Sequence, residues 1–177
     1  AAHKIGLVGY FGKLARALGS KNVFSASTLD QMPKQLARGL MFGHWLSVAL
    51  PDIVRTDLLL VIGANPLASN GSMWTVPDFK GKARAMQARG GRLIVIDPRR
   101  TEMVDGPHLK AAHHLALTPG TNVAIVTALA HVIVTEKLYD EEFIRTRCDW
   151  DEFQDYAEFV SQPNHSPEAV EILTGVK

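Results

Sequence analysis

The run LLLVIGANPLASN at residues 58–70 constrains the fold of this chain more than any other stretch. Its five consecutive apolar residues, without polar alternation, are typical of a strand buried on both faces of a parallel sheet. Gly63 allows a sharp turn at the carboxyl end of that strand, and Pro66 cannot continue a strand ladder. Ligands of open α/β sheets bind just beyond the carboxyl ends of strands, so we expect a ligand site at this turn.

Two further predicted strands also end in polar clusters. Residues 92–96 form an apolar run that leads into the segment 97–101, and residues 114–117 form a short strand that leads into the segment 119–122. Helical patterns separate these strands, which predicts an α/β fold with a mostly parallel sheet flanked by helices, Rossmann-like and three-layered. Because parallel strands end at the same edge of a sheet, we expect the three clusters to gather there, as in a nucleotide site.

Length and composition set the limits of this interpretation. The 177 residues suffice for one domain, and we expect an α/β domain over residues 1–160 and a polar extension over residues 161–177. The net charge of +1 gives no electrostatic reason for nucleic acid or an anionic membrane as a partner. A single cysteine, Cys148, excludes an internal disulfide and any cysteine-rich zinc or iron–sulfur site built from this chain alone.

One long apolar segment, residues 123–134, is a helix candidate that contains His131. It is too short to cross a bilayer, so we expect a helix buried in the core. Thr121 or Asn122 is expected to cap the start of this helix.

Further elements are predicted before the central strand. Residues 5–8 are predicted to form a strand and residues 22–25 a second one, followed by a helix over residues 34–41 after Pro33. The chain opens with Ala1 and enters a strand-like run almost at once, with no signal peptide, which indicates a piece of a longer protein. Because the cut ends hide any export signal, cytoplasm is only the default localisation.

The strand-end clusters have the side chains of a nucleotide site. Asp97 can accept hydrogen bonds from both hydroxyls of a ribose, and Arg99 and Arg100 beside it can neutralise a phosphate. The turn at Gly63 is not G-x-G-x-x-G, and Asp97 lies 34 positions after Gly63, whereas dinucleotide folds place the acidic residue about 20 positions on. The usual NAD pattern is therefore absent. Each cluster alone is also consistent with an ordinary turn, and their coincidence at three strand ends favours a ligand site.

Three segments, LLLVIGANPLASNGS, GGRLIVIDPRRTE and HHLALTPGTNVAIVTALAHVI, resemble the molybdopterin oxidoreductases of the dimethyl sulfoxide reductase family. That family has a strand followed by G-x-N-P, a strand followed by D-P-R-x-T, and P-G-T-D leading into an apolar helix. The order and spacing agree over residues 57–138. The resemblance implies a fragment of a large multi-domain oxidoreductase that carries molybdenum or tungsten on two pterin guanine dinucleotides. It also implies an iron–sulfur cluster in an N-terminal part that this stretch lacks.

The resemblance implies that the parent protein transfers electrons, often with an oxygen atom, while the isolated fragment is inactive. Eight residues are expected to line the molybdopterin guanine dinucleotide. They are Gly63, Asn65 and Ser69 at the pterin-diphosphate part, Asp97 and Arg99 at the guanosine ribose and phosphate, and Gly120, Thr121 and Asn122 at the guanine.

Asn122 departs from the family pattern, in which an Asp accepts from two guanine N–H groups. An amide offers one acceptor oxygen and two donors. We therefore expect weaker guanine selectivity, unless another residue helps or the pocket is lost.

A second departure concerns the metal. The family segment N-V-x-S-x-x-R-L-C supplies the protein ligand, and NVFSASTLD at residues 22–30 places Asp30 at that position. A carboxylate is a hard ligand that suits a high-valent molybdenum centre. Asp30 can equally be an acidic residue that favours the start of the helix after Pro33.

An alternative function is a non-catalytic nucleotide-binding or interaction domain, similar to the central domain of thiamine-diphosphate enzymes. The strand-end turns would then serve only the shape of the fold. Under the oxidoreductase interpretation, the partners are the remaining domains of the same polypeptide and an electron-transfer partner that the sequence does not identify. Neither nucleic acid nor a membrane segment is expected. His113 and His114 are expected to be structural.

Overall fold

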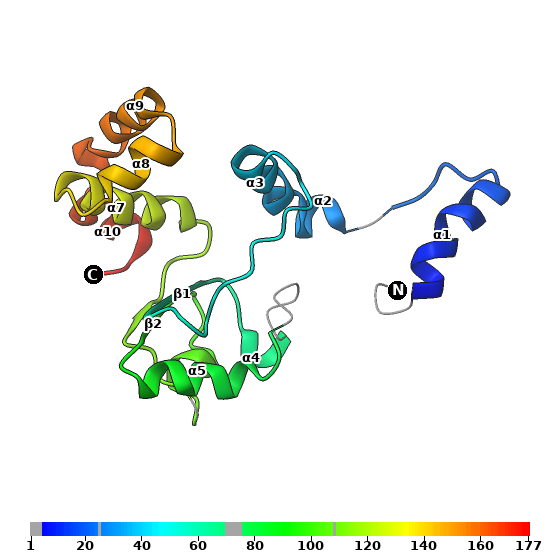
Figure 1. Cartoon of the computed structure of the whole chain (residues 1–177), viewed down its shortest axis with the longest axis horizontal. Helices are drawn as coiled ribbons and strands as arrows, with labels where there is room; N and C mark the ends of the chain where they lie inside the picture. Colours follow the sequence, from blue (N-terminus) through cyan, green and yellow to red (C-terminus); the bar gives the residue numbers. More distant parts are fainter. Residues whose placement is uncertain (1–4, 25, 70–75, 108) are drawn as a thin grey trace. The chain divides into compact units, whose positions relative to one another are not determined.

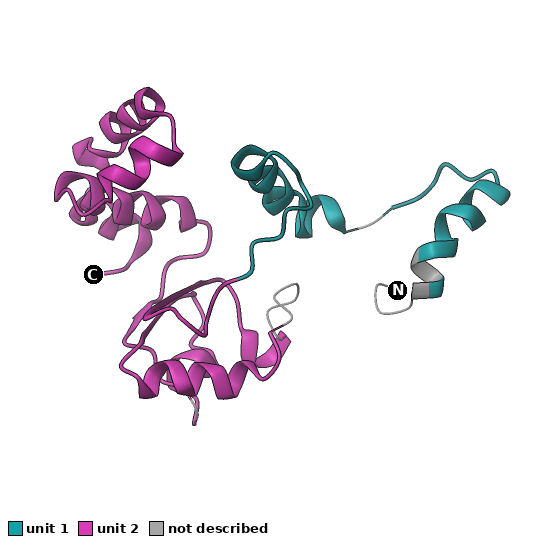
Figure 2. Ribbon diagram, in the orientation of Figure 1, with its two compact units in different colours: residues 1–50 teal, residues 51–177 magenta. Residues whose placement is uncertain are grey.

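The computed structural model describes residues 5–24, 26–69, 76–107 and 109–177. The chain divides into two compact units, residues 1–50 and 51–177, which Figure 2 colours separately.

The first unit is helical in its described residues, with α1 (Ile5–Ala17), α2 (Ser27–Asp30) and α3 (Met32–Phe42), as Figure 1 shows. The strand predicted over residues 5–8 is wrong, because these residues form the first turn of α1. Apolar residues at positions 7, 11 and 14 continue a helical spacing that a four-residue window cannot reveal. Residues 22–24 form no strand either, and Ser25 lies outside the described residues.

The helix predicted after Pro33 is confirmed. Pro33 lies in the first turn of α3, where its missing N–H costs no intrahelical bond. Gly43 ends the helix in the left-handed conformation at φ 75°.

The second unit contains a parallel sheet of three strands in the order β1-β2-β3. The strands are β1 (Leu58–Ile62), β2 (Arg92–Ile96) and β3 (His113–Leu115). In the register, Ile62 lies beside Ile96, and Ile96 lies beside Leu115. The predicted α/β fold with a parallel sheet is confirmed at this level.

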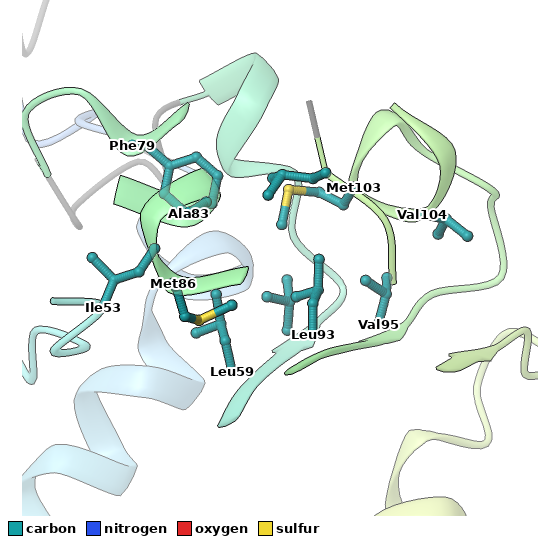
Figure 3. Packing of buried hydrophobic residues seen from close by; sticks show 11 residues of the cluster. Ile53, Leu59, Phe79, Ala83, Met86, Leu93, Val95, Met103 and Val104 are labelled. Carbon is teal, nitrogen blue, oxygen red and sulfur yellow. The ribbon is translucent and has the colours of Figure 1, made fainter. Parts of the chain in front are cut away.

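One face of the sheet is packed. Helix α5 (Phe79–Ala88) and the short helices α4 (Pro66–Ser69) and α6 (Glu102–Asp105) contribute to this side. Alternate residues of β1 and β2 join them in one apolar cluster, shown in Figure 3. Its buried members are Ile53, Leu59, Val61, Phe79, Ala83, Met86, Leu93, Val95, Met103, Val104 and Leu109.

The other face of β1 is open to solvent. Leu58, Leu60 and Ile62 are 54%, 44% and 44% exposed, so burial alternates along the strand. The prediction of a strand buried on both faces is therefore wrong for this chain. A purely apolar run does not say whether a second layer covers the sheet.

Four helices follow the sheet: α7 (Asn122–Thr135), α8 (Glu141–Arg147), α9 (Trp150–Val160) and α10 (Pro167–Thr174), with a short 3₁₀ turn, η1 (Pro163–His165). Helix α7 packs against α9 and α10. Helix α7 was expected to be buried, but only Ile125 and Ala128 are buried on it. A second cluster of Ile96, Leu117 and Ile125 joins α7 to the end of β2.

Helix α10 lies within the segment expected to be a polar extension, and its Val170 and Thr174 are buried. The boundary at residue 160 stays a prediction. In the described part of the chain, no helix has both the length and the apolar character needed to cross a membrane.

Candidate functional site

The carboxyl ends of the three strands meet at one edge of the sheet, as predicted. Gly63 N–H donates to the carbonyl of Ile96 at 2.9 Å, and Asp97 N–H donates to the carbonyl of Leu115 at 3.2 Å. These bonds hold the turn after β1 beside the turn after β2. Gly63 adopts φ 60°, a left-handed conformation that explains why glycine stands at the start of this turn.

Asn65 links the first two polar clusters through its side chain. Its Nδ2 donates to Glu102 Oε2 at 2.7 Å, across 37 positions of the sequence. The main-chain carbonyl of Asn65 starts α4 by accepting from the N–H groups of Ala68 and Ser69, both at 3.0 Å. Ser69 Oγ donates to the same carbonyl at 3.3 Å. The amide oxygen Oδ1 of Asn65 is buried and has no hydrogen-bond partner among the described residues.

Asp97 organises the turn after β2. Its Oδ1 accepts from the backbone N–H of Arg99 at 2.7 Å, which makes an Asx turn. Its main-chain carbonyl accepts from His114 Nε2 at 2.9 Å, because a carbonyl has no hydrogen to donate. The structural role expected for His114 is therefore confirmed, and the Arg99 side chain is exposed at the same turn.

The charges around this turn are paired. The pKa of Glu102 lies below its usual value, because its carboxylate accepts its own backbone N–H and the Asn65 amide, and because Arg99 is near. Arg100 forms an ion pair with Asp105, whose carboxylate accepts from the guanidinium, and this hydrogen bond lowers the pKa of Asp105. Arg100, which was also expected to neutralise a phosphate, is thus paired with Asp105, and the side chains of both arginines of the DPRR segment are exposed.

The third cluster lies at the start of α7. Gly120 has φ 92°, Thr121 occupies the N-cap position and Asn122 is the exposed first residue of the helix. The hydroxyl of Thr121 donates to the carbonyl of Thr118 at 2.7 Å, so the expected side-chain cap is not formed.

Packing of Ile125 on Ile96 brings the beginning of α7 to the end of β2. In the described part of the chain, we find no hydrogen bond from residues 120–122 to Asn65 or Asp97. Among the described residues, the start of α7 is linked to the end of β2 by the apolar packing of Ile125 on Ile96.

Asp30 ends α2 in the first unit and is exposed. Its role as metal ligand stays a prediction. Within the residues that the structure describes, no group of three or more His, Cys, Asp or Glu side chains lies close enough to hold a metal ion.

Sequence reasoning missed Glu102. Nothing in the sequence pairs this residue with Asn65, because the two meet only when β1 and β2 lie side by side. The sequence offered one local signal, because Glu102 directly follows Thr101, a residue type that commonly caps the start of a helix. In the structure the Thr101 hydroxyl accepts from Met103 N–H at 3.4 Å at the start of α6.

Comparisons with known proteins give a consistent result. A family model described as molybdopterin oxidoreductase matches residues 7–172. Formate dehydrogenase H of Escherichia coli is 33% identical over 166 residues, which are 93% of this chain and 21% of that protein. Dimethyl sulfoxide reductase DmsA of Escherichia coli is 34% identical over 122 residues, which are 67% of this chain and 14% of that protein.

Among solved structures, acetylene hydratase from Pelobacter acetylenicus matches with a TM-score of 0.67 and 28% identity, over 91% of this chain and 20% of that chain. The chain therefore spans about a fifth of the length of formate dehydrogenase H and of this structure. These matches argue against the module similar to thiamine-diphosphate enzymes. The chain belongs to the molybdopterin oxidoreductase family, as its resemblance to the dimethyl sulfoxide reductase family predicted.

Proposed function

We propose that this chain forms part of the binding site for a molybdopterin guanine dinucleotide in a molybdenum or tungsten oxidoreductase. The observation that carries the proposal is the meeting of the Gly63 and Asp97 turns at one sheet edge, through the bonds from Gly63 to Ile96 and from Asp97 to Leu115. Ligands of α/β sheets bind at this edge. When bound, the cofactor supplies electron transfer or oxygen-atom transfer through its metal.

The residues at the edge fit a ligand with ribose and phosphate groups. Asp97 presents a carboxylate for ribose hydroxyls, and the exposed Arg99 can pair with a phosphate. The buried, unpartnered Oδ1 of Asn65 is a polar atom that a bound ligand would satisfy. Gly63 and Gly120 have no atom within 4 Å of the place where a Cβ would stand, which leaves room for close approach to the backbone.

We assign the guanine to the segment of Gly120, Thr121 and Asn122, and the pterin-diphosphate part to Gly63, Asn65 and Ser69. The exposed face of β1 supports a second helical layer, supplied by other parts of a longer polypeptide, which would complete a three-layer Rossmann-like domain. An iron–sulfur cluster and the other half of the cofactor site belong to those parts, with Asp30 as the proposed metal ligand. This chain alone is then inactive.

The names of the relatives guide the choice of test. Formate dehydrogenase, dimethyl sulfoxide reductase and acetylene hydratase act on different substrates by name, so a substrate assay of this chain is not informative. Nucleotide binding is a test that does not depend on the substrate.

The test is isothermal titration calorimetry of the purified chain with GDP and with ADP. We expect tighter binding of GDP, and a loss of about tenfold or more in Asp97→Ala, because a charge-assisted hydrogen bond contributes about 1.5–3 kcal/mol. Asp155→Ala is the matched control, since Asp155 is an exposed carboxylate on α9. It should leave GDP affinity unchanged.

Two results would contradict this assignment. One is a chain that is folded by circular dichroism and binds neither nucleotide. The other is an equal effect of Asp97→Ala and Asp155→Ala. Equal affinities for GDP and ADP would keep the ribose and phosphate assignment and would mean that Asn122 gives no selectivity for guanine.

A further inference from the structure

Glu102 holds the side-chain amide of Asn65 in one orientation. The two side chains meet at 2.7 Å between Nδ2 and Oε2. An ionised carboxylate offers no hydrogen, so the NH₂ side of the amide has to face it. The carboxylate also accepts its own backbone N–H and lies near Arg99, and both lower the pKa of Glu102 and favour its ionised form.

The other end of the amide is left without a hydrogen-bond partner among the described residues. This atom, Asn65 Oδ1, is buried. An asparagine before a helix commonly uses this oxygen to accept an N–H of the first turn. Here the main-chain carbonyl of Asn65 accepts from Ala68 and Ser69 instead, so the helix does not use Oδ1.

We propose that Glu102 is a positioning residue that acts through Asn65 to select a hydrogen-bond donor of the bound cofactor. This inference rests on the proposed function. A phosphate oxygen cannot donate to Oδ1, and it would meet the negative charge of Glu102 behind the amide. Ring N–H and amino groups can donate. Within the pterin-diphosphate part expected at Asn65, the inference therefore selects the pterin and assigns the phosphates elsewhere.

Neopterin, which carries ring N–H and amino donors, is the probe, and binding is followed by fluorescence titration. In Asn65→Asp two carboxylates would face each other, and the donor to Glu102 is lost. We expect neopterin affinity to fall about tenfold. In Glu102→Gln the new amide can accept or donate, so both orientations of Asn65 become available and affinity falls by about threefold or more.

The double variant Asn65→Asp, Glu102→Gln separates positioning from a merely structural role. The new amide donates to the new carboxylate, and the second carboxylate oxygen still faces the ligand. We expect neopterin affinity to return to within about threefold of the unmodified chain, a coupling that a double-mutant cycle measures. The side-chain amide resonances of Asn65 in ¹⁵N NMR should move in Glu102→Gln without any ligand.

Glu168→Gln is the matched control. Glu168 lies in the first turn of α10, and its pKa is also lowered by its own backbone N–H and by the Ser166 side chain. The same change of charge there should leave neopterin affinity unchanged.

The outcomes are distinguishable. Unchanged neopterin affinity in both single variants, or no rescue in the double variant, overturns the role of Glu102. GDP binding without neopterin binding in the unmodified chain overturns the selection of the pterin. A folded chain that binds neither compound rejects the proposed function itself.

Discussion

The backbone N–H of Gly63 donates to the carbonyl of Ile96 at 2.9 Å, directly after the last paired residue of the β1–β2 ladder. This bond lies where the sheet ends and the proposed site starts. Asp97 directly follows Ile96, and Asn65 lies two positions after Gly63. The positive φ of Gly63 is what turns the chain at this point. Substitutions at Gly63 therefore test the geometry of the whole edge.

Replacing Gly63 by alanine should lower the free energy of unfolding by about 1–2 kcal/mol, the cost of a Cβ in the left-handed conformation. No atom lies within 4 Å of the new Cβ, so the effect would be backbone strain rather than a clash. Gly63→Asn should cost less, because asparagine tolerates this conformation better. Urea denaturation followed by circular dichroism measures both, and equal costs would contradict the explanation.

Replacing Asn122 by aspartate should increase the preference for GDP over ADP by about tenfold. The carboxylate accepts from two guanine N–H groups, where the amide offers one acceptor, and bonds to a charged group contribute about 1.5–3 kcal/mol. Calorimetric titration with the two nucleotides measures the ratio of affinities. An unchanged ratio would remove the base assignment of this segment.

The pKa of Glu102 predicts how stability depends on pH. The folded state lowers this pKa from its usual value, so the contribution of the ionised carboxylate is present above the unfolded pKa of about 4.5 and is lost as pH falls through the folded pKa. Glu102→Gln should therefore lower the melting temperature at pH 7 and have a smaller effect near pH 3. If Glu102→Gln lowers the melting temperature by the same amount at pH 7 and near pH 3, this explanation is contradicted.

We expect a second effect on the free energy of unfolding at His131. Its Nδ1 donates to the carbonyl of Val160 at 2.7 Å, which joins α7 to the last turn of α9. His131→Phe leaves the carbonyl of the fully buried Val160 without this donor, which should cost about 1–3 kcal/mol. His165→Phe is the control, because His165 makes a similar bond to the Phe159 carbonyl at an exposed position. Equal losses in urea denaturation would show that burial is not the cause.

Local sequence was enough to predict the elements whose residues carry their own signal. Strands β1 and β2 follow from continuous apolar runs, and the turns follow from glycine, proline and aspartate at their ends. The strand expected over residues 5–8 was wrong because the helical spacing of α1 extends beyond those four residues.

The parts of the site that sequence did not predict depend on contacts between distant segments. The bond between Asn65 and Glu102 needs β1 and β2 to lie side by side before it exists. Thr121 or Asn122 was predicted to cap α7. Thr121 occupies the N-cap position, but its hydroxyl donates to the carbonyl of Thr118 instead of capping the helix, and helix propensity does not decide between these partners.

Adjacent leucines of β1 test the layer arrangement. Leu59 is 7% exposed within the apolar cluster, and Leu60 is 44% exposed on the opposite face. Leu59→Ala should cost about 2–5 kcal/mol, the range for buried leucines, and Leu60→Ala should cost about 1 kcal/mol or less in the same urea denaturation of this chain. If Leu59→Ala and Leu60→Ala lower the free energy of unfolding equally, both faces of the sheet are already covered in this chain.

The two substitutions also test the proposed three-layer domain. In the longer polypeptide that we propose, a second helical layer would bury Leu60, because a parallel sheet is normally covered on both faces. The cost of Leu60→Ala should then rise toward that of Leu59→Ala, and hydrogen exchange of the β1 amides should slow. If Leu60→Ala stays as mild in the longer polypeptide as in this chain, the exposed face is a permanent surface and the sheet has only one layer of helices.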